Sequence, residues 1–399
     1  MTDTRVVLVD GARQCGKSTL VARVGAERDA VWRSLDRAAT RNAAEFDPTA
    51  FVDVERMLIV DEVQRVPDLL LAIKESVDSD PRPGRYLLTG SARLLGLRGL
   101  PDALPGRMET IELWPLSQGE IDERPDGFVD AVFTVGAGLR HESGESRGGY
   151  IDRIVRGGFP ESVARTGRRR QAFLDNYLAD LVNRDVMQLS AIERGPQMRA
   201  LIRLLAARSG QLLVPGNLAR SLGLPQSTVD RYLGLLEEVF LIKRIPAWSR
   251  NLSARAVSTA KGAMVDSGIA ANVLGQDEAA LSRPDSQLGG LLEGFVAMEI
   301  ARQLTWSDTR AEMFHYRTKD QVEVDIVLED RSGRVVAIDV KESATARSDD
   351  FRGIDHLARR LGGDLIAGLV LYTGTETLSF GERKLAVPVS ALWELGGQP

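Results

Sequence analysis

A glycine-rich turn between a strand pattern and a helix pattern constrains this chain more than any other feature. The apolar run Val6-Val7-Leu8-Val9 predicts a short buried strand. The residues that follow read GARQCGKST, match the pattern G-x-x-x-x-G-K-S/T, and lead into a helical pattern. Strand, glycine turn and helix in this order form a loop that wraps phosphates, so the sequence predicts an α/β fold with a nucleotide site near its start.

The residues of this loop have separate predicted roles. Backbone N–H groups turn inward around the phosphates, and the start of the helix adds its positive end. We expect Lys17 to reach the β- and γ-phosphate oxygens and Ser18 to ligate Mg²⁺. The predicted cofactors are therefore ATP and Mg²⁺, and the predicted nucleotide-binding residues are Gly11, Ala12, Arg13, Gln14, Cys15, Gly16, Lys17, Ser18 and Thr19.

A second apolar strand pattern ends in two adjacent carboxylates, Asp61 and Glu62. Asp61 is predicted to hold Mg²⁺ through water or through Ser18, and Glu62 to orient and polarise the attacking water. Residues 31–35, between the two motifs, predict another strand. An inserted strand with a Glu beside the Asp is typical of the additional-strand ATPases, so the sequence predicts an ATP hydrolase rather than a kinase or a Ras-like GTPase.

Two later segments predict further residues at this site. Thr89 and Ser91 follow a strand pattern and are both candidates to touch the γ-phosphate or the attacking water; the alternative is an ordinary strand-end turn. Arg107 precedes a strand pattern over 109–114, where AAA-type ATPases carry the arginine finger that a neighbouring subunit receives. A finger predicts a homo-oligomer, whereas a surface arginine would pair with Glu109 or Glu112.

The composition limits the other function classes. At 399 residues the chain predicts several domains, and its single cysteine, Cys15, excludes an intramolecular disulfide framework and favours a reducing cytoplasm. Three scattered histidines give no zinc pattern. No apolar run approaches the ~18 residues of a membrane span, and the first residues lack a secretory signal. We therefore expect a cytoplasmic protein with no membrane partner.

The middle of the chain predicts a linker, a helical lid and a winged helix-turn-helix. Residues 121–149 end in a Gly-, Ser- and charge-rich stretch and predict a loosely ordered linker. Helical spacing over 171–189 predicts a lid over the nucleotide base, and the preceding run Arg168-Arg169-Arg170 predicts a solvated face or a phosphate contact. Helix patterns over 198–209, 214–221 and 225–239, followed by a strand over 241–245, have the order of a winged helix-turn-helix.

DNA is the partner predicted for this winged helix. The start of its third helix carries side chains suited to base edges and phosphates, namely Gln226, Ser227, Thr228 and Arg231. Residues 191–255 contain ten Arg and Lys against four Asp and Glu, a net charge of about +6. Residues 256–399 contain fifteen against twenty-two, about −7. The alternative is a module that packs against other domains.

The last third of the chain places acidic residues and a lysine on a helix and two strands. Glu293 lies in a helix pattern, Asp325 in a strand pattern, and a further strand ends in Asp339-Val340-Lys341. A helix Glu, a strand Asp and a D-x-K triplet form the layout of PD-(D/E)xK nucleases. Asp325 and Asp339 would share a second Mg²⁺ or Mn²⁺, Glu293 would add a ligand, and Lys341 would orient or deprotonate water. The alternatives are a buried ion-pair network and a nuclease-like fold without catalysis.

The order of these motifs resembles the bacterial and archaeal AAA-like ATP-binding proteins with a C-terminal domain of unknown function related to PD-(D/E)xK nucleases. The resemblance runs over nearly the whole chain and rests on GARQCGKSTL, LIVDEVQRVPDLL, LLTGSARLL, PGRMETIELWPLS, GGFPES, MVDSGIA and EVDIVL…AIDVK. It implies an ATPase site of Lys17, Ser18, Asp61 and Glu62, with Arg107 as the finger. It also implies a nuclease-like triad of Asp325, Asp339 and Lys341.

The resemblance and the residues together predict the domain organisation. We expect an additional-strand P-loop ATPase core over 1–121, an insertion or linker over 122–149, a helical lid over 150–190, a winged helix over 191–252, and a restriction-endonuclease-like α/β domain over 253–399. Relatives carry a helical segment before the first strand, which predicts a start further upstream. The predicted function couples ATP binding and hydrolysis to DNA binding or processing. The alternative is an ATP-dependent switch that binds a protein partner through an inactive nuclease-like domain.

Overall fold

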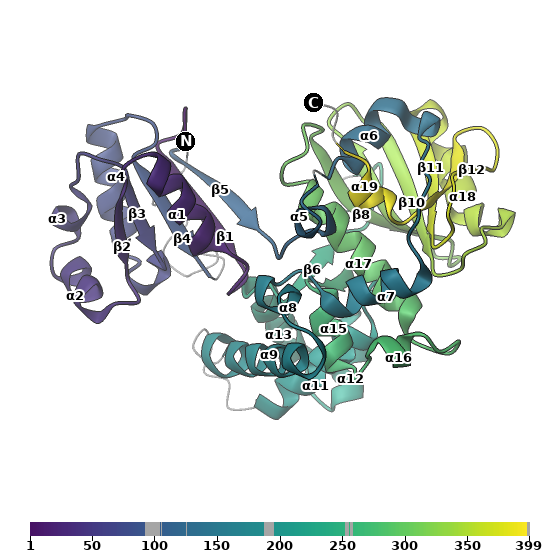
Figure 1. Cartoon of the computed structure of the whole chain (residues 1–399), viewed down its shortest axis with the longest axis horizontal. Helices are drawn as coiled ribbons and strands as arrows, with labels where there is room; N and C mark the ends of the chain where they lie inside the picture. The colour runs from purple at the N-terminus through teal and green to yellow at the C-terminus, as the bar shows by residue number, and fades with distance from the viewer. Residues whose placement is uncertain are drawn as a thin grey trace. The chain divides into compact units, whose positions relative to one another are not determined.

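The computed structural model describes residues 1–91, 104, 106–124, 126–186, 195–251, 255 and 258–396 (Figure 1). The chain divides into two compact units. The first contains Met1–Pro115 and Glu238–Phe240, and the second contains Leu116–Glu237 and Leu241–Pro399. Within the described residues, none of the helices combines the length and the apolar character that crossing a membrane requires.

The first unit is built on a five-stranded parallel sheet with the order β2-β3-β4-β1-β5. Parallel strands need crossovers, and helices α1 to α4 lie in the connections between these strands (Figure 1). The elements are β1 (Val6–Gly11), α1 (Lys17–Glu27), β2 (Val31–Ser34), α2 (Ala38–Phe46), α3 (Pro48–Val52), β3 (Leu58–Asp61), α4 (Leu69–Ser79), β4 (Tyr86–Gly90) and β5 (Met108–Leu113).

The central strands β1, β3 and β4 are buried on both faces, as in other parallel sheets, whereas the edge strands β2 and β5 are partly exposed. Val6 and Leu8 of β1 join a core cluster with Ile73 of α4, whereas Val7 and Val9 join a second cluster with Val21 of α1. Alternate residues of one strand therefore supply two cores. The polar residues that follow the strands are left at the carboxyl edge of the sheet, which is where ligands bind in open α/β sheets.

The strand predicted at residues 31–35 is present as β2 (Val31–Ser34), between the two nucleotide motifs in the sequence and at the edge of the sheet. The strand that separates β1 from β3 is β4, which follows both of them in the sequence. A crossover connection can place a parallel strand beyond its sequence neighbour, so the order along the chain does not determine the order in the sheet.

The second unit begins with a helical half that also contains a two-stranded antiparallel sheet of β6 and β7. The helices and the strand predicted between residues 198 and 245 are present, with ends within three residues of those expected. The elements are α5 (Gln118–Ile121), α6 (Phe128–Val135), α7 (Arg147–Arg156), α8 (Pro160–Val163), α9 (Gly167–Asp180), a π-helical turn (Leu181–Val186), α11 (Gly195–Ala207), α12 (Pro215–Leu222), α13 (Gln226–Glu238), β6 (Ile242–Ile245), β7 (Lys261–Met264), α15 (Ser267–Val273) and α16 (Glu278–Leu281).

The second unit ends in a six-stranded mixed sheet with the order β12-β13-β11-β10-β9-β8. Strands β10, β11 and β13 are parallel to one another, and the other pairings are antiparallel. Helix α17 packs against β10, and α18 packs against β9, β10 and β11 (Figure 1). The elements are α17 (Leu288–Gln303), β8 (Ala311–Arg317), β9 (Glu323–Asp330), β10 (Val335–Lys341), α18 (Arg352–Leu361), β11 (Leu365–Tyr372), β12 (Leu378–Ser379), β13 (Lys384–Pro388) and α19 (Ala391–Glu394).

The segment predicted as a loosely ordered linker, 122–149, is folded onto the end of the chain. Helix α6 buries Phe128, Val132 and Phe133. The Gly127 N–H donates to the carbonyl oxygen of Leu395 at 2.8 Å. The glycines and charges near residue 145 suggested a linker, but the apolar run of α6 gains more from burial than the segment loses by ordering.

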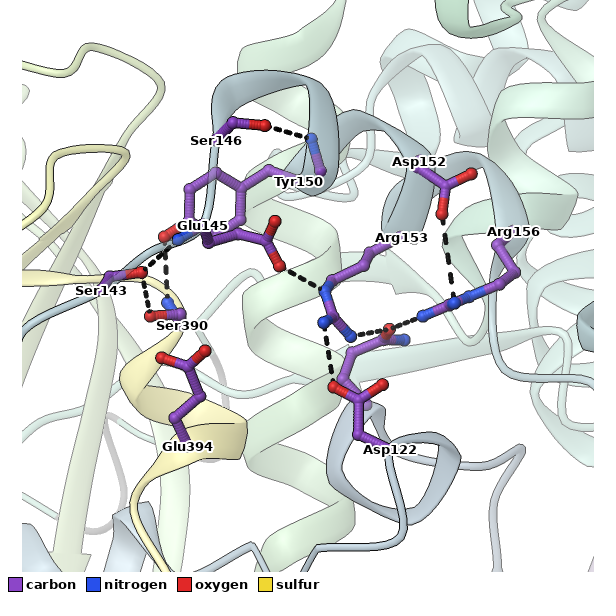
Figure 2. A network of polar contacts seen from close by, with 12 residues as sticks. Asp122, Ser143, Glu145, Ser146, Tyr150, Asp152, Arg153, Arg156, Ser390 and Glu394 are labelled. Atoms are coloured by element: carbon purple, nitrogen blue, oxygen red, sulfur yellow. Dashed lines mark hydrogen bonds and ion pairs between the residues drawn. The ribbon is translucent and has the colours of Figure 1, made fainter.

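A polar network fixes the same segment (Figure 2). The Arg153 guanidinium contacts Asp122 at 2.9 Å and Glu145 at 2.8 Å, and lies 4.8 Å from the centre of the Trp393 ring. The Ser390 N–H donates to the Tyr150 hydroxyl at 3.3 Å. Residues near position 150 and residues after 390 therefore share both apolar and polar contacts.

Candidate functional site

The phosphate loop joins β1 to α1 and contains all the predicted nucleotide-binding residues from Gly11 to Thr19. Gly11 has a φ of +155°, and a Cβ there would lie 2.1 Å from the carbonyl oxygen of Leu113 on β5. The loop can thus lie against β5 only with glycine at this position. Lys17 is buried, and its Nζ donates to the carbonyl oxygens of Gly11 at 2.9 Å and Ala12 at 2.7 Å. The ammonium group is therefore held across the loop.

Cys15 is a packing residue of the same loop. Its Sγ lies 3.3 Å from the carbonyl oxygen of Leu113, and burial raises the pKa of the thiol. A thiol with a raised pKa is a poor nucleophile, so the residue holds the loop against β5 rather than supplying chemistry.

Ser18 and Asp61, the two residues predicted to hold Mg²⁺, are in direct contact. Ser18 Oγ donates to Asp61 Oδ1 at 3.0 Å, and Thr89 Oγ1 donates to the same oxygen at 2.7 Å. Ser34 Oγ donates to Asp61 Oδ2 at 3.3 Å. One hydroxyl and one carboxylate with oriented oxygens suit Mg²⁺, which takes one or two protein ligands together with phosphate oxygens. Sequence reasoning missed Ser34, whose position at the end of β2 was the available signal.

Glu62 is held in an unusual conformation beside Asp61. Its φ of 62° and ψ of 47° lie in the left-handed region, and its N–H donates to Thr89 Oγ1 at 3.0 Å. Its Oε2 accepts hydrogen bonds from Ser91 Oγ at 3.0 Å and from Gln64 Nε2 at 2.5 Å. Thr89 and Ser91, both of which the sequence names as candidates, therefore have different contacts: Thr89 contacts Asp61 and the Glu62 N–H, and Ser91 contacts the Glu62 carboxylate. Such strained positions cluster at functional sites.

Arg107 has a partner that neither sequence alternative named. Its Nε lies 2.5 Å from Asp78 Oδ1, and its Nη2 lies 3.1 Å from Asp78 Oδ2. The hydrogen bond from Arg107 lowers the pKa of Asp78. Both side chains are partly exposed, so the pair contributes little to stability and can open at a small cost.

In the second unit the predicted acidic residues do meet, and a lysine joins them. Lys261 of β7 is 3% exposed, and its Nζ lies 2.7 Å from Glu293 Oε1 and 2.9 Å from Asp325 Oδ1. Asp325 Oδ2 accepts the Val340 N–H at 3.0 Å, and Asp339 Oδ1 accepts the Asp325 N–H at 3.2 Å. Lys261 lies 64 positions from Asp325 in the sequence, outside any spacing that the D-x-K motif defines.

Burial and charge separate the pKa values of this cluster. Burial and the nearby Asp325 raise the pKa of Glu293 to about 8 and that of Asp339 well above its usual value. Burial also acts to raise the pKa of Asp325, but the attraction of Lys261 outweighs it and the net shift is downward. Burial acts to lower the pKa of Lys261, and the two carboxylates outweigh it, so the pKa rises. Lys261 is therefore a permanent cation.

The structure does not support the predicted metal site of Glu293, Asp325 and Asp339. In the part of the chain that the structure describes, no three or more His, Cys, Asp or Glu side chains form a group that could hold a metal ion. The cation that lies between Glu293 and Asp325 is the Lys261 ammonium. The motif predicted which carboxylates converge but could not show that a distant lysine reaches them.

A groove of about 960 Å³ lies beside the edge strand β8. The described residues that line it include four cations, Arg250, Arg317, Lys319 and Arg360, and no Asp or Glu. Arg317 is paired with Glu323 at 2.6 Å, and Arg360 Nη1 donates to the Tyr316 hydroxyl at 3.0 Å. Arg250 is paired with Asp364, so part of the positive charge along the groove is neutralised.

The predicted DNA-contact residues of α13 lie on its outer face. Gln226, Ser227 and Arg231 are exposed, and Val229 and Leu233 on the opposite face are buried. The arginine run in the first turn of α9 is not one solvated face. Arg168 and Arg169 are exposed, but Arg170 is buried and its Nε donates to the carbonyl oxygens of Ser162 at 3.2 Å and Arg165 at 3.0 Å. Helical spacing turns the third arginine inward.

Three family models match the chain. An AAA domain matches residues 3–122, a domain of unknown function (DUF8612) matches 147–280, and a second domain of unknown function (DUF4143) matches 288–392. The first unit is therefore an AAA-type domain with a parallel sheet, and the second contains a separate C-terminal sheet domain.

Curated relatives match over most of the chain. The uncharacterized proteins Rv2008c of Mycobacterium tuberculosis and Mb2031c of Mycobacterium bovis are each 30% identical over 98% of this chain and 81% of their own length. An uncharacterized protein of Haemophilus influenzae is 24% identical over 61% of this chain and 57% of its own length.

Among solved structures, the chain is similar to a Signal Transduction ATPase with Numerous Domains protein with a tetratricopeptide repeat sensor, PH0952 from Pyrococcus horikoshii. The match covers 75% of this chain and 44% of that chain, at 12% identity and a TM-score of 0.24, which is too low to support a conclusion about the fold. The mycobacterial relatives are more informative. With 30% identity over 81% of their length, they show that this chain belongs to the family of Rv2008c and Mb2031c, and its N-terminal part is an AAA domain.

Proposed function

We propose that the chain is a Mg²⁺-dependent ATPase of the AAA type. The observation that carries this proposal is the paired environment of Asp61 and Glu62 at the end of β3. The Asp61 carboxylate accepts a hydrogen bond from the Ser18 hydroxyl, and the Glu62 carboxylate accepts one from the Ser91 hydroxyl. Two adjacent carboxylates with separate partners can take separate roles, one at the metal ion and one at the attacking water.

Each residue of the proposed site has one task. Lys17 would exchange its two carbonyl partners for β- and γ-phosphate oxygens, and Ser18 and Asp61 would hold the ion. Mg²⁺, when bound, neutralises charge on the phosphates. Glu62 would accept a proton from the attacking water, and Ser91 and Gln64 would fix the position of its carboxylate. The resulting reaction is hydrolysis of the γ-phosphate of ATP.

Arg107 is proposed as a finger that acts on a neighbouring subunit, which requires its pair with Asp78 to open. ATPase activity per subunit should then rise with protein concentration. Mixing Arg107→Ala with Glu62→Gln subunits should restore part of the hydrolysis, because a mixed interface combines an intact Glu62 with an intact Arg107. Steady-state phosphate release over a range of concentrations tests this. The control is Arg82→Ala, which removes another exposed arginine–aspartate pair. Turnover that is independent of concentration, in a monomer, would rule the finger out.

We also propose that the second unit binds DNA. The order α11, α12, α13, β6 is that of a winged helix, which we place at residues 191–252, and the exposed Arg231 lies on its third helix. The cationic groove next to β8 offers a second surface for phosphates. We propose further that residues 253–399 are a nuclease-like domain, since Glu293, Asp325 and Asp339 converge as in that layout.

DNA binding predicts two separable effects. Arg231→Ala and Lys243→Ala should each weaken binding to duplex DNA and reduce the slope of log K against log salt by about one for each phosphate that is no longer neutralised. Lys319→Ala with Arg360→Ala should do the same if the groove contributes. Fluorescence anisotropy with a labelled duplex between ~50 and 200 mM salt measures both. Arg169→Ala, an exposed arginine outside both surfaces, is the control. If all variants bind like the wild type, the helices of α11–α13 are a packing module.

The second candidate function is an ATP-dependent switch that binds a protein partner through an inactive nuclease-like domain. The position of Lys261 favours it, because a lysine already supplies a cation between Glu293 and Asp325. Salt-insensitive association with a protein partner, without DNA binding, would support this candidate over the first.

A further inference from the structure

The cluster around Lys261 joins a buried lysine to carboxylate oxygens and to backbone N–H groups. The Lys261 ammonium contacts Glu293 Oε1 and Asp325 Oδ1. The other oxygen of Asp325 accepts the Val340 N–H, and Asp339 Oδ1 accepts the Asp325 N–H. A buried charge costs several kcal/mol unless such partners satisfy it. These contacts therefore satisfy the buried charges of Lys261 and Asp325.

The backbone around the cluster fixes Lys261 in this position. Lys261 pairs with Ile245 across the β6–β7 sheet and bridges to Leu212. On the other side, a Cβ at Gly210 would lie 2.5 Å from the Glu293 carboxyl carbon. The Glu293 carboxylate is thus packed between Gly210 and Lys261, and a side chain larger than glycine at position 210 would collide with it. A Mg²⁺ ion that bound Glu293 and Asp325 together, at ligand distances of about 2.0–2.1 Å, would have to displace the ammonium group that now contacts both.

We infer that Lys261 is a built-in cation that takes the place of a divalent metal ion in this cluster of Glu293, Asp325 and Asp339. The lysine joins β7 of the helical half to α17 and β9 of the C-terminal half, so the cluster fastens two parts of the second unit together. Lys341 then has no metal-bound water to act on, and the cluster does not cleave DNA. This inference rests on the proposed nuclease-like fold but not on the proposed ATPase, so the two can fail separately.

Removal of the lysine should convert the cluster into a metal site. Lys261→Met keeps the unbranched shape of the side chain but removes the ammonium group, which leaves the carboxylates without a counter-charge that a divalent ion can then supply. In an Asp61→Asn background, which disables the nucleotide-site ion, the Lys261→Met full-length chain should bind one Mn²⁺. The loss of free Mn²⁺ signal in electron paramagnetic resonance measures this. Adding Asp325→Asn should abolish the gain, and Lys384→Met, which removes another lysine–aspartate pair, should produce none.

The same background protein with Lys261 intact provides the decisive arm. Adding Asp325→Asn to this protein should not change the amount of Mn²⁺ that it binds. Its melting temperature should be the same in chelator and in millimolar Mn²⁺. If the protein with Lys261 binds Mn²⁺ and loses this binding when Asp325→Asn is added, the inference is overturned. A folded Lys261→Met variant that gains no Mn²⁺ would also overturn it, because the carboxylates would then not form a cation site. If Lys261→Met fails to fold, the arm with Lys261 decides alone.

Discussion

Glu62→Gln should bind ATP as the wild type does and hydrolyse it at least about 100-fold more slowly, because general base catalysis contributes that much or more. Glutamine has nearly the shape of glutamate and can still contact Ser91, but it cannot take a proton from water. Phosphate release under saturating MgATP, together with nucleotide binding measured by calorimetry, separates the two effects.

Gln64→Ala is the matched comparison. It removes one hydrogen bond to Glu62 and leaves the carboxylate, so hydrolysis should fall by less than in Glu62→Gln. Ser91→Ala should resemble Gln64→Ala for the same reason. A Glu62→Gln protein that hydrolyses ATP at the wild-type rate would remove Glu62 from the site.

Asp266→Ala should lower the free energy of unfolding of the second unit by ~3 kcal/mol, since two buried N–H groups lose their acceptor and a helix loses its cap. The Asp266 side chain is 1% exposed and accepts the Gly158 N–H at 2.7 Å and the Ile269 N–H at 2.9 Å. Its burial raises the pKa of the carboxyl group. Urea unfolding followed by circular dichroism measures the decrease in stability.

Asp277→Ala is the matched control, because Asp277 caps α16 through the Ala280 N–H at 2.8 Å but is exposed. It should cost about 1 kcal/mol. Asp266→Asn keeps one acceptor oxygen, so its loss in free energy of unfolding should lie between those of Asp266→Ala and Asp277→Ala. If Asp266→Ala and Asp277→Ala unfold at the same urea concentration, the buried carboxylate does not join the two segments.

The proposed nucleotide site could be located in the sequence because its parts are local. Gly11, Lys17 and Ser18 belong to one turn, and a spacing of a few residues determines which atoms converge. Asp61 and Glu62 are adjacent and follow an apolar strand, so their position at the carboxyl edge followed from the parallel sheet. Asp266 shows the other case. The segments GGFPES and MVDSGIA were recognisable, but only the structure shows that the carboxylate of one accepts the N–H of the other.

The parts that sequence reasoning missed depend on contacts between distant residues. The sheet order of β2 and β4 depends on crossovers, the pair of Arg107 with Asp78 joins residues 29 positions apart, and Lys261 reaches Asp325 from another sheet. Local composition also gave a wrong prediction where a charged stretch and an apolar stretch lie in one segment. The charged end of 122–149 suggested a linker, although its apolar helix is buried.

The rate of phosphate release from MgATP by the purified wild-type chain and by Lys17→Ala is the measurement that tests the central claim most directly. The loop geometry places the Lys17 ammonium where it can exchange two carbonyl oxygens for phosphate oxygens. We predict steady turnover by the wild type that requires Mg²⁺, and loss of both ATP binding and turnover in Lys17→Ala. A wild-type chain that neither binds nor hydrolyses ATP, or a Lys17→Ala chain with the wild-type rate, would contradict the proposed ATPase.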